Sequence, residues 1–130
     1  LAVEAGLLRD PYEQIGSLQS ELFRAARLVV DTGLHSKKWT REEAIIYMMD
    51  NAGEVRSESE SEIERYIVWP GQATSYMIGR IKIMELRERA KAELGNRFNI
   101  KDFHSVVLMN GILPLTVLEA LVDQYIKENS

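Results

Sequence analysis

Hydrophobic residues recur every three or four positions along most of the 130-residue chain, and this spacing predicts an all-α fold of about six helices. The helices are expected over residues 11–32, 41–52, 57–68, 70–94 and 100–110, and from Pro114 to about residue 128. No stretch alternates convincingly between apolar and polar residues, as a half-buried strand would. We therefore expect a single all-helical domain over residues 1–130, packed as an irregular helical bundle.

The first expected helix has a distinct apolar side. Asp10 can cap its start, Pro11 suits its first position, and Gly33 is expected to end it. The apolar residues keep helical spacing, so we expect them to face the core. They are Ile15, Leu18, Leu22, Ala25 and Val29.

The opposite side of that helix is polar. It carries Arg24, Arg27 and Asp31, and His35 follows just beyond Gly33. Two interpretations stay open. In the first, this is a solvated face on which an Arg27–Asp31 pair contributes only about a few tenths of a kcal/mol. In the second, it is a polar wall that orients His35.

The second helix has a clear start signal. Thr40 and Glu43 form a capping box, in which each side chain bonds to the other residue's backbone N–H. Trp39, directly before the cap, could pack against Ala44 as a hydrophobic staple. Gly53 is expected to end this helix.

The acidic stretch over residues 54–64 alternates serine with glutamate. It could be a disordered linker, an acidic metal site, or the exposed start of a helix with a serine as cap. We favour the helix because Ile63, Tyr66 and Ile67 give it an apolar stripe.

A Trp69-Pro70-Gly71 corner leads into the long fourth helix, where Pro70 fits the first turn. One face of that helix should be core, formed by Ala73, Met77, Ile81 and Met84. Another is polar, small and aromatic, formed by Gln72, Ser75, Tyr76 and Gly79. We hypothesise that this second face lines an active site whose metal is bound outside this chain.

Composition narrows the range of functions. The chain is 45% hydrophobic and 28% charged, with a net charge of −4, as in a soluble globular protein. Basic residues are interleaved with acidic ones, which argues against a nucleic-acid partner. The absence of cysteine excludes disulfides, thiolate nucleophiles and cysteine-based zinc sites. No apolar run approaches the roughly 18 residues that span a bilayer.

Local motifs for chemistry are scarce. The two histidines, His35 and His104, lie in different elements, and there is no His-Glu-x-x-His, phosphate loop or Gly-x-Ser-x-Gly. A zinc site needs three or four ligands with defined geometry, which these residues alone do not supply. We expect His104 to be structural. From the residues alone, the conclusion stops at a helical domain with a polar groove.

Six short motifs in order resemble a known family. The central one reads Glu-Arg-Tyr-x-x-x-Pro-Gly-Gln-Ala-x-Ser-Tyr-x-x-Gly over residues 64–79. The others are Arg24 to His35, Trp39 to Ala44, Leu86-Arg87, Phe103-His104 and Gly111 to Leu115. Together they resemble the C-terminal region of a bacterial family known as domain of unknown function eight-eight-five, and the match covers essentially the whole chain.

The resemblance implies a larger protein. Intact members look like zinc-dependent peptidases related to carboxypeptidase Taq and other helical gluzincins, so this chain would be the C-terminal part of a larger helical, zincin-like fold. Their zinc motifs, His-Glu-Ala-x-Pro-Gly-His and a later Glu-Gly-Trp, are absent here. Leu1, which is not a methionine, would fall shortly after them. We therefore expect no cofactor in this chain, zinc in the intact protein, and no peptidase activity from the chain alone.

The resemblance also implies roles for individual residues. Tyr76 is the first candidate, and His35 the second, for donating a hydrogen bond to the oxyanion in peptide hydrolysis. Arg65 or Arg27 could hold a substrate carboxylate, because arginine offers a planar bidentate fork. Tyr66 and Gln72 could make further substrate hydrogen bonds. The competing interpretation is a buried structural network between helices.

The expected partners are the N-terminal half of the same protein, which would carry the zinc site, and a peptide substrate. The family suggests a periplasmic or membrane-anchored lipoprotein. The alternative function is a non-catalytic helical interaction or oligomerisation domain, which could form a homo-oligomer through surfaces that the N-terminal half would otherwise cover.

Overall fold

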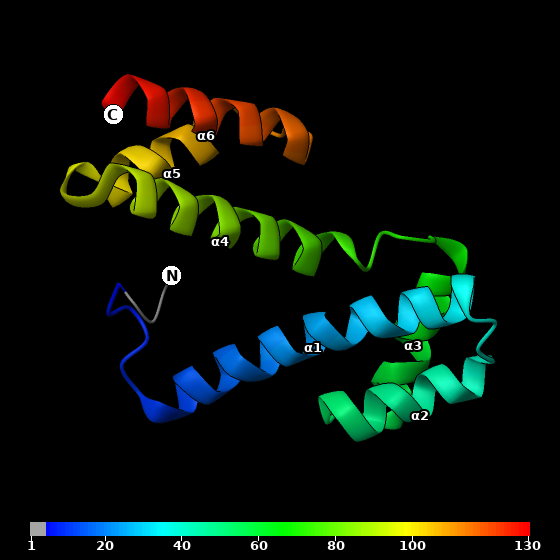
Figure 1. Ribbon diagram of the computed structural model, residues 1–130. Helices are drawn as coiled ribbons and strands as arrows, with labels where there is room; N and C mark the ends of the chain where they lie inside the picture. Colours follow the sequence, from blue (N-terminus) through cyan, green and yellow to red (C-terminus); the bar gives the residue numbers. More distant parts are fainter. Residues whose placement is uncertain (1–4) are drawn as a thin grey trace. The chain divides into compact units, whose positions relative to one another are not determined.

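The computed structural model describes residues 5–130, and within them it confirms an all-α fold of six α-helices without strands (Figure 1). The elements are α1 (Pro11–Ser36), α2 (Arg41–Ala52), α3 (Arg56–Val68), α4 (Ser75–Leu94), the short 3-10 helix η1 (Gly95–Arg97), α5 (Ile100–Leu108) and α6 (Leu115–Asn129). The chain divides into two compact units, Leu1–Met77 and Ile78–Ser130, which are described separately. A single domain and a zincin-like fold stay predictions.

The first unit is built from α1, α2 and α3 around one apolar core. The predicted capping box of Thr40 with Glu43 is present at the start of α2, and Asp10, the predicted cap of α1, forms a second capping box with Glu13. Gly53 ends α2 as predicted, in the left-handed conformation. The buried apolar side chains of this core are Ala26, Val30, Ala44, Ile45, Met48, Ala52, Ile63, Tyr66 and Ala73.

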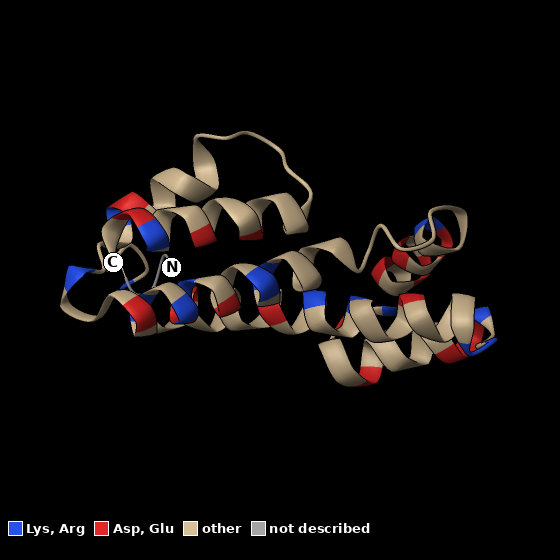
Figure 2. Ribbon diagram, turned by 45° about the horizontal axis from the view of Figure 1, so that its top comes forward, with Lys and Arg blue, Asp and Glu red and all other residues tan. Residues whose placement is uncertain are grey.

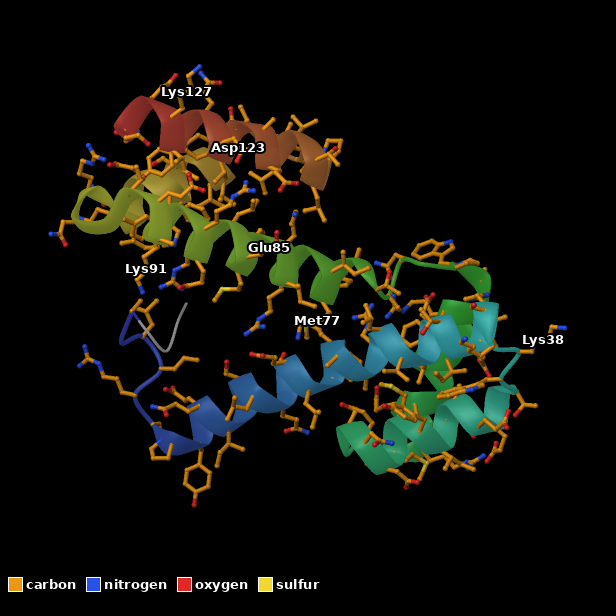
Figure 3. All side chains as sticks on the ribbon, viewed as in Figure 1. Lys38, Met77, Glu85, Lys91, Asp123 and Lys127 are labelled. Carbon is orange, nitrogen blue, oxygen red and sulfur yellow. The ribbon has the colours of Figure 1, made fainter. Side chains whose placement is uncertain are left out.

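Gly33 does not end α1, which continues to Ser36. The glycine has a packing role instead, because a Cβ atom at this position would lie 2.5 Å from the Trp39 ring. The Trp39 backbone N–H also donates to the Gly33 carbonyl at 3.0 Å. The chain turns at Lys38, which has a φ of 59° and whose side chain points away from the first unit (Figure 3). The glycine signal therefore marks a close contact and not the helix end.

The predicted core side of α1 is wrong. Its apolar residues Ile15, Leu18, Leu22 and Val29 are exposed, whereas Arg27 and Asp31 are only 6% and 3% exposed. The reason is that α2 and α3 pack against a different face, which carries Phe23, Ala26, Val30 and Leu34. The solvated-face interpretation is excluded by the same burial.

The acidic stretch forms the helix α3, as predicted, and is not a disordered linker. Its N-cap is Val55, which makes no side-chain cap hydrogen bond, so the expected serine cap is wrong. Ser59 is instead completely buried among the helices. Ile63 and Tyr66 point inward as predicted, but Ile67 is exposed.

The long helix begins five residues later than predicted, at Ser75. Residues 70–74 form consecutive turns, in which the Gln72 N–H donates to the Trp69 carbonyl and the Thr74 N–H to the Gly71 carbonyl. Gly71 has a φ of 80°, a conformation that favours glycine, and this breaks the helix that Pro70 was expected to start. The turns place Gln72 ahead of α4.

The second unit contains most of α4 together with η1, α5 and α6. Its core is entirely apolar and comprises Leu86, Ala90, Leu94, Phe103, Leu118, Val122, Tyr125 and Ile126. Ile81 and Met84, expected in the core, are exposed because the buried face of α4 runs through Leu86 and Ala90.

Charged residues of the second unit lie outside its core. Lys82 and Arg89 of α4 both pair with Glu119 of α6 at 3.2 Å, and Arg89 also pairs with Asp123. Basic and acidic residues are interspersed along the helices (Figure 2). Over the described residues, no helix combines the length and apolar character needed to cross a membrane.

Candidate functional site

The predicted site residues Arg65 and Tyr66 meet on α3 around a third residue, Glu62. These positions are three and four residues apart, so they share one face of the helix. Arg65 Nη2 donates to Glu62 Oε2 at 2.6 Å, and the Tyr66 hydroxyl donates to the same oxygen at 2.5 Å. Tyr66 is almost completely buried, which fixes this pair of donors on the carboxylate.

The arrangement shifts two pKa values. Burial alone raises the pKa of the Glu62 carboxyl, but the hydrogen bonds from Tyr66 and Arg65 outweigh it, so the net pKa lies below its usual value. Burial, together with the hydrogen bond to Glu62, raises the pKa of the Tyr66 hydroxyl. At neutral pH the site therefore holds an ionised carboxylate and a neutral phenol.

Gln72 links α3 to α1 and α4. Its side-chain oxygen Oε1 accepts from Arg65 Nη1 at 3.0 Å and from Arg27 Nη2 at 3.4 Å, so two guanidinium groups converge on one oxygen. Its nitrogen Nε2 donates to the Tyr76 hydroxyl oxygen at 3.5 Å. Because Tyr76 accepts in this bond, its own O–H remains available as a donor.

Arg27 lies buried among aromatic rings. The centre of its guanidinium lies 4.5 Å from the Tyr76 ring centroid, 5.4 Å from that of Tyr66 and 5.5 Å from that of Phe23. Cation–π contacts of this kind favour the charged group by about 0.5–2 kcal/mol each, depending on desolvation. Its Nε is nevertheless buried without a hydrogen-bond partner. The charge is held in place, but its hydrogen-bonding capacity is not fully used.

Asp31 fixes the turn that carries Gln72. Its two carboxylate oxygens lie 3.0 and 3.1 Å from the backbone nitrogen of Gly71, whose N–H donates to them. The structure thus gives this carboxylate a partner other than the one expected from helical spacing. A buried carboxylate bonded to a backbone N–H makes a strong, directional contact.

His35 lies beside the backbone of α3. Its Nε2 is 3.0 Å from the Tyr66 carbonyl oxygen, which can only accept, so Nε2 carries the proton in this contact. The histidine therefore bonds to the main chain behind Tyr66, while Tyr76 contacts Gln72 and Arg27.

Five of the six predicted site residues therefore meet in one place, and His35 lies at its edge. We call this group, with Glu62 added, the polar cluster: Arg27, Glu62, Arg65, Tyr66, Gln72 and Tyr76. Glu62 was missed because it sits in the acidic run, although its spacing to Arg65 and Tyr66 was visible. Gly79 belongs to the predicted polar face of the fourth helix, and a Cβ atom there would meet nothing within 4 Å among the described residues.

The polar cluster combines several hydrogen-bond donors with one ionised carboxylate. Two guanidinium groups, an amide and a phenol are hydrogen-bond donors suited to a carboxylate or to a carbonyl oxygen that gains negative charge. Among the described residues, no three histidine or acidic side chains are grouped so that they could hold a metal ion. The residues present therefore do not fit a zinc site.

Comparison with known proteins defines the class. The model of the family described as bacterial protein of unknown function (DUF885) matches residues 1–122, and the chain belongs to this family. No curated protein matches.

A solved structure gives a more specific likeness. The chain is similar to the crystal structure of the putative lipoprotein from Colwellia psychrerythraea, with 52% identity and a TM-score of 0.96. The match covers 98% of this chain but only 22% of the Colwellia chain. This chain therefore spans about a fifth of the length of that relative.

Proposed function

We propose that this chain is the C-terminal, substrate-binding part of a zinc-dependent peptidase that hydrolyses peptide bonds. In this proposal the zinc is held by an N-terminal part of the same protein, because residues 5–130 contain no group of side chains that fits a metal site. The chain alone would then be inactive. Membership of the family supports the proposal, together with the resemblance of intact family members to helical zinc-dependent peptidases.

The observation that carries the proposal is the convergence of Arg27 and Arg65 on the Gln72 amide oxygen, beside the Tyr76 hydroxyl. An amide oxygen held by two guanidinium groups occupies a position that suits a ligand carboxylate, which would bind both cations more strongly than a neutral oxygen does. The free hydrogen-bonding capacity of Arg27 fits the same interpretation.

In the proposed reaction, Arg65 and Arg27 orient the peptide through a carboxylate, and Tyr66 and Gln72 support them. Tyr76 donates its O–H to the scissile carbonyl oxygen as that oxygen gains negative charge. Its hydroxyl suits this role because the side chain is 45% exposed and its hydrogen bond from Gln72 leaves the proton free. His35 is the second candidate for the same donor, and because its Nε2 proton is bonded to the Tyr66 carbonyl, it would donate from Nδ1 only as the imidazolium.

The test is Tyr76→Phe in the longest reading frame that contains this chain. We expect kcat for a peptide substrate to fall by roughly 100–1000-fold, the usual effect of losing one oxyanion donor, while zinc content stays unchanged. Tyr12→Phe is the matched control, because Tyr12 is an exposed tyrosine at the start of α1, outside the polar cluster. Unchanged turnover in Tyr76→Phe would remove this residue from the mechanism.

The location of the protein is part of the proposal. The Colwellia relative is described as a putative lipoprotein, which supports a membrane-anchored or periplasmic protein. Fractionation of cells that produce the intact protein tests this, and recovery in the cytoplasm would contradict it.

The alternative function is a non-catalytic helical interaction domain, and one observation favours it. Exposed apolar residues follow one side of α1, which is unusual for a free surface. Light scattering separates the two functions when combined with zinc analysis of the intact protein. A stable homo-oligomer without zinc or peptide hydrolysis would favour the interaction domain.

A further inference from the structure

The N-terminal half of α1 carries a line of exposed apolar side chains. Ile15, Leu18 and Leu22 are 59%, 66% and 49% exposed, and Val29 continues the line further along the helix. We call these four residues the α1 stripe. Their spacing of three, four and seven residues places them on one side of the helix. The stripe therefore has the pattern of a helix face that packs against another element.

No described residue of the first unit covers the α1 stripe. The helix has 26 residues and is about 39 Å long at 1.5 Å per residue, whereas α2 and α3 are about half that length. Those two helices pack on the face that contains Ala26 and Val30. Figure 1 shows that the N-terminal half of α1 extends past both of them.

The neighbours of the stripe also resemble an interface and not a solvated surface. At about 100° per residue, Gln14 and Gln19 lie on either side of the stripe, and both are uncharged. The centres of protein interfaces are depleted of charged residues. We therefore expect the surface that packs on this stripe to be apolar. A charged surface would be an unsuitable partner for this face.

We propose that the α1 stripe is the surface on which the remaining part of a longer family protein packs, through an apolar face of its own. The argument for this occupant is the length of the Colwellia relative. That chain contains this fold at 52% identity, but 22% coverage leaves most of its length outside the match. This inference assigns a contact surface to the N-terminal part of the protein. It rests on the proposed function only in requiring that such a part exists.

Cysteine accessibility tests the proposal, because the chain contains no cysteine of its own. Leu18→Cys and Leu22→Cys are made both in the 130-residue chain and in the longest reading frame that contains it. Ser57→Cys, at an exposed position of α3, is the control. We expect maleimide to modify the stripe cysteines at least about tenfold more slowly in the longer protein, and the control equally fast in both.

Equal modification rates of the stripe cysteines in the two proteins would overturn the proposal. So would the absence of a longer reading frame. If the stripe cysteines already react slowly in the 130-residue chain, light scattering shows whether a second copy covers them, and either answer again overturns it. Circular dichroism confirms that each variant is folded. Peptide hydrolysis measured on the same samples is a separate readout. If the stripe is protected but the protein hydrolyses no peptide, the proposed peptidase activity is rejected and the proposed contact surface is kept.

Discussion

The two units place their charges in opposite ways. The first buries Arg27 and Asp31 among its helices and bonds both to residues of the turn before α4. The second has an entirely apolar core and keeps Arg89 and Asp123 in ion pairs near its surface. Burying a charged side chain costs folding free energy unless the charge is well hydrogen-bonded. The buried charges of the first unit therefore need specific bonding partners, which an apolar core does not need. This difference is consistent with the proposal that the ligand-binding groups lie in the first unit.

Removing the buried carboxylate should give the largest effect. Asp31→Ala leaves the Gly71 N–H without its acceptor, and we expect the first unit to lose about 3 kcal/mol of stability. Tryptophan fluorescence during urea unfolding measures this selectively, because both tryptophans, Trp39 and Trp69, lie in the first unit.

The matched control is Asp123→Ala, which removes a mostly exposed carboxylate from the second unit and should leave the fluorescence midpoint unchanged. Equal shifts of the urea midpoint for the two variants would mean that the buried aspartate stabilises the protein no more than the exposed one.

An added methyl group tests how tightly the first unit is packed. Gly33→Ala introduces a Cβ atom where the Trp39 ring lies 2.5 Å away, and we expect a loss of about 2 kcal/mol from overpacking. Gly16→Ala on the same helix meets nothing within 4 Å among the described residues and should stabilise by about 0.5–1 kcal/mol. Thermal unfolding of the two variants should therefore show shifts of opposite sign. A stabilising Gly33→Ala would contradict the packing role of this glycine.

The smallest expected change in stability is the one that follows protonation of Glu62 at acidic pH. The folded pKa of Glu62 is lowered, so its contribution to stability is present above its unfolded pKa and is lost as the pH falls through the folded value. We expect Glu62→Gln to unfold more easily at neutral pH and to lose less stability than the wild type below about pH 4.5. Urea unfolding followed by tryptophan fluorescence at several pH values measures the stability of the wild type and of Glu62→Gln. Glu88→Gln in the second unit is the control. Parallel acid curves for wild type and Glu62→Gln would contradict the role of this carboxylate.

Local signals in the sequence predicted most of the fold. The helix caps at Asp10 and Thr40 were predicted because a cap involves only about four consecutive residues. The helices α5 and α6 end within two residues of their predicted limits. The apolar side of α1 was misplaced because periodicity shows that a helix has an apolar face, but not which face this chain itself covers. Gly33 was misread for a similar reason, since its ring partner is a tertiary contact.

Most residues of the candidate site were predicted, but their arrangement in space was not. Family motifs gathered Arg27, Arg65, Gln72 and Tyr76, and these residues do meet. The burial of Arg27 depends on rings from three separate helices, which no local pattern reveals. The break between Pro70 and Ser75 was missed because it depends on the positive φ of Gly71.

The bond between Asp31 and Gly71 has a consequence for the order of folding. It joins residues 40 positions apart, whereas α1 and α2 are connected by only a few residues. Closing a longer loop costs more chain entropy, so the α1–α2 hairpin should form early and this bond late, once α3 has docked. Gln72 reaches Arg27 only after that closure. The polar cluster is then completed only when folding of the first unit is complete, and a partly folded chain cannot bind through it.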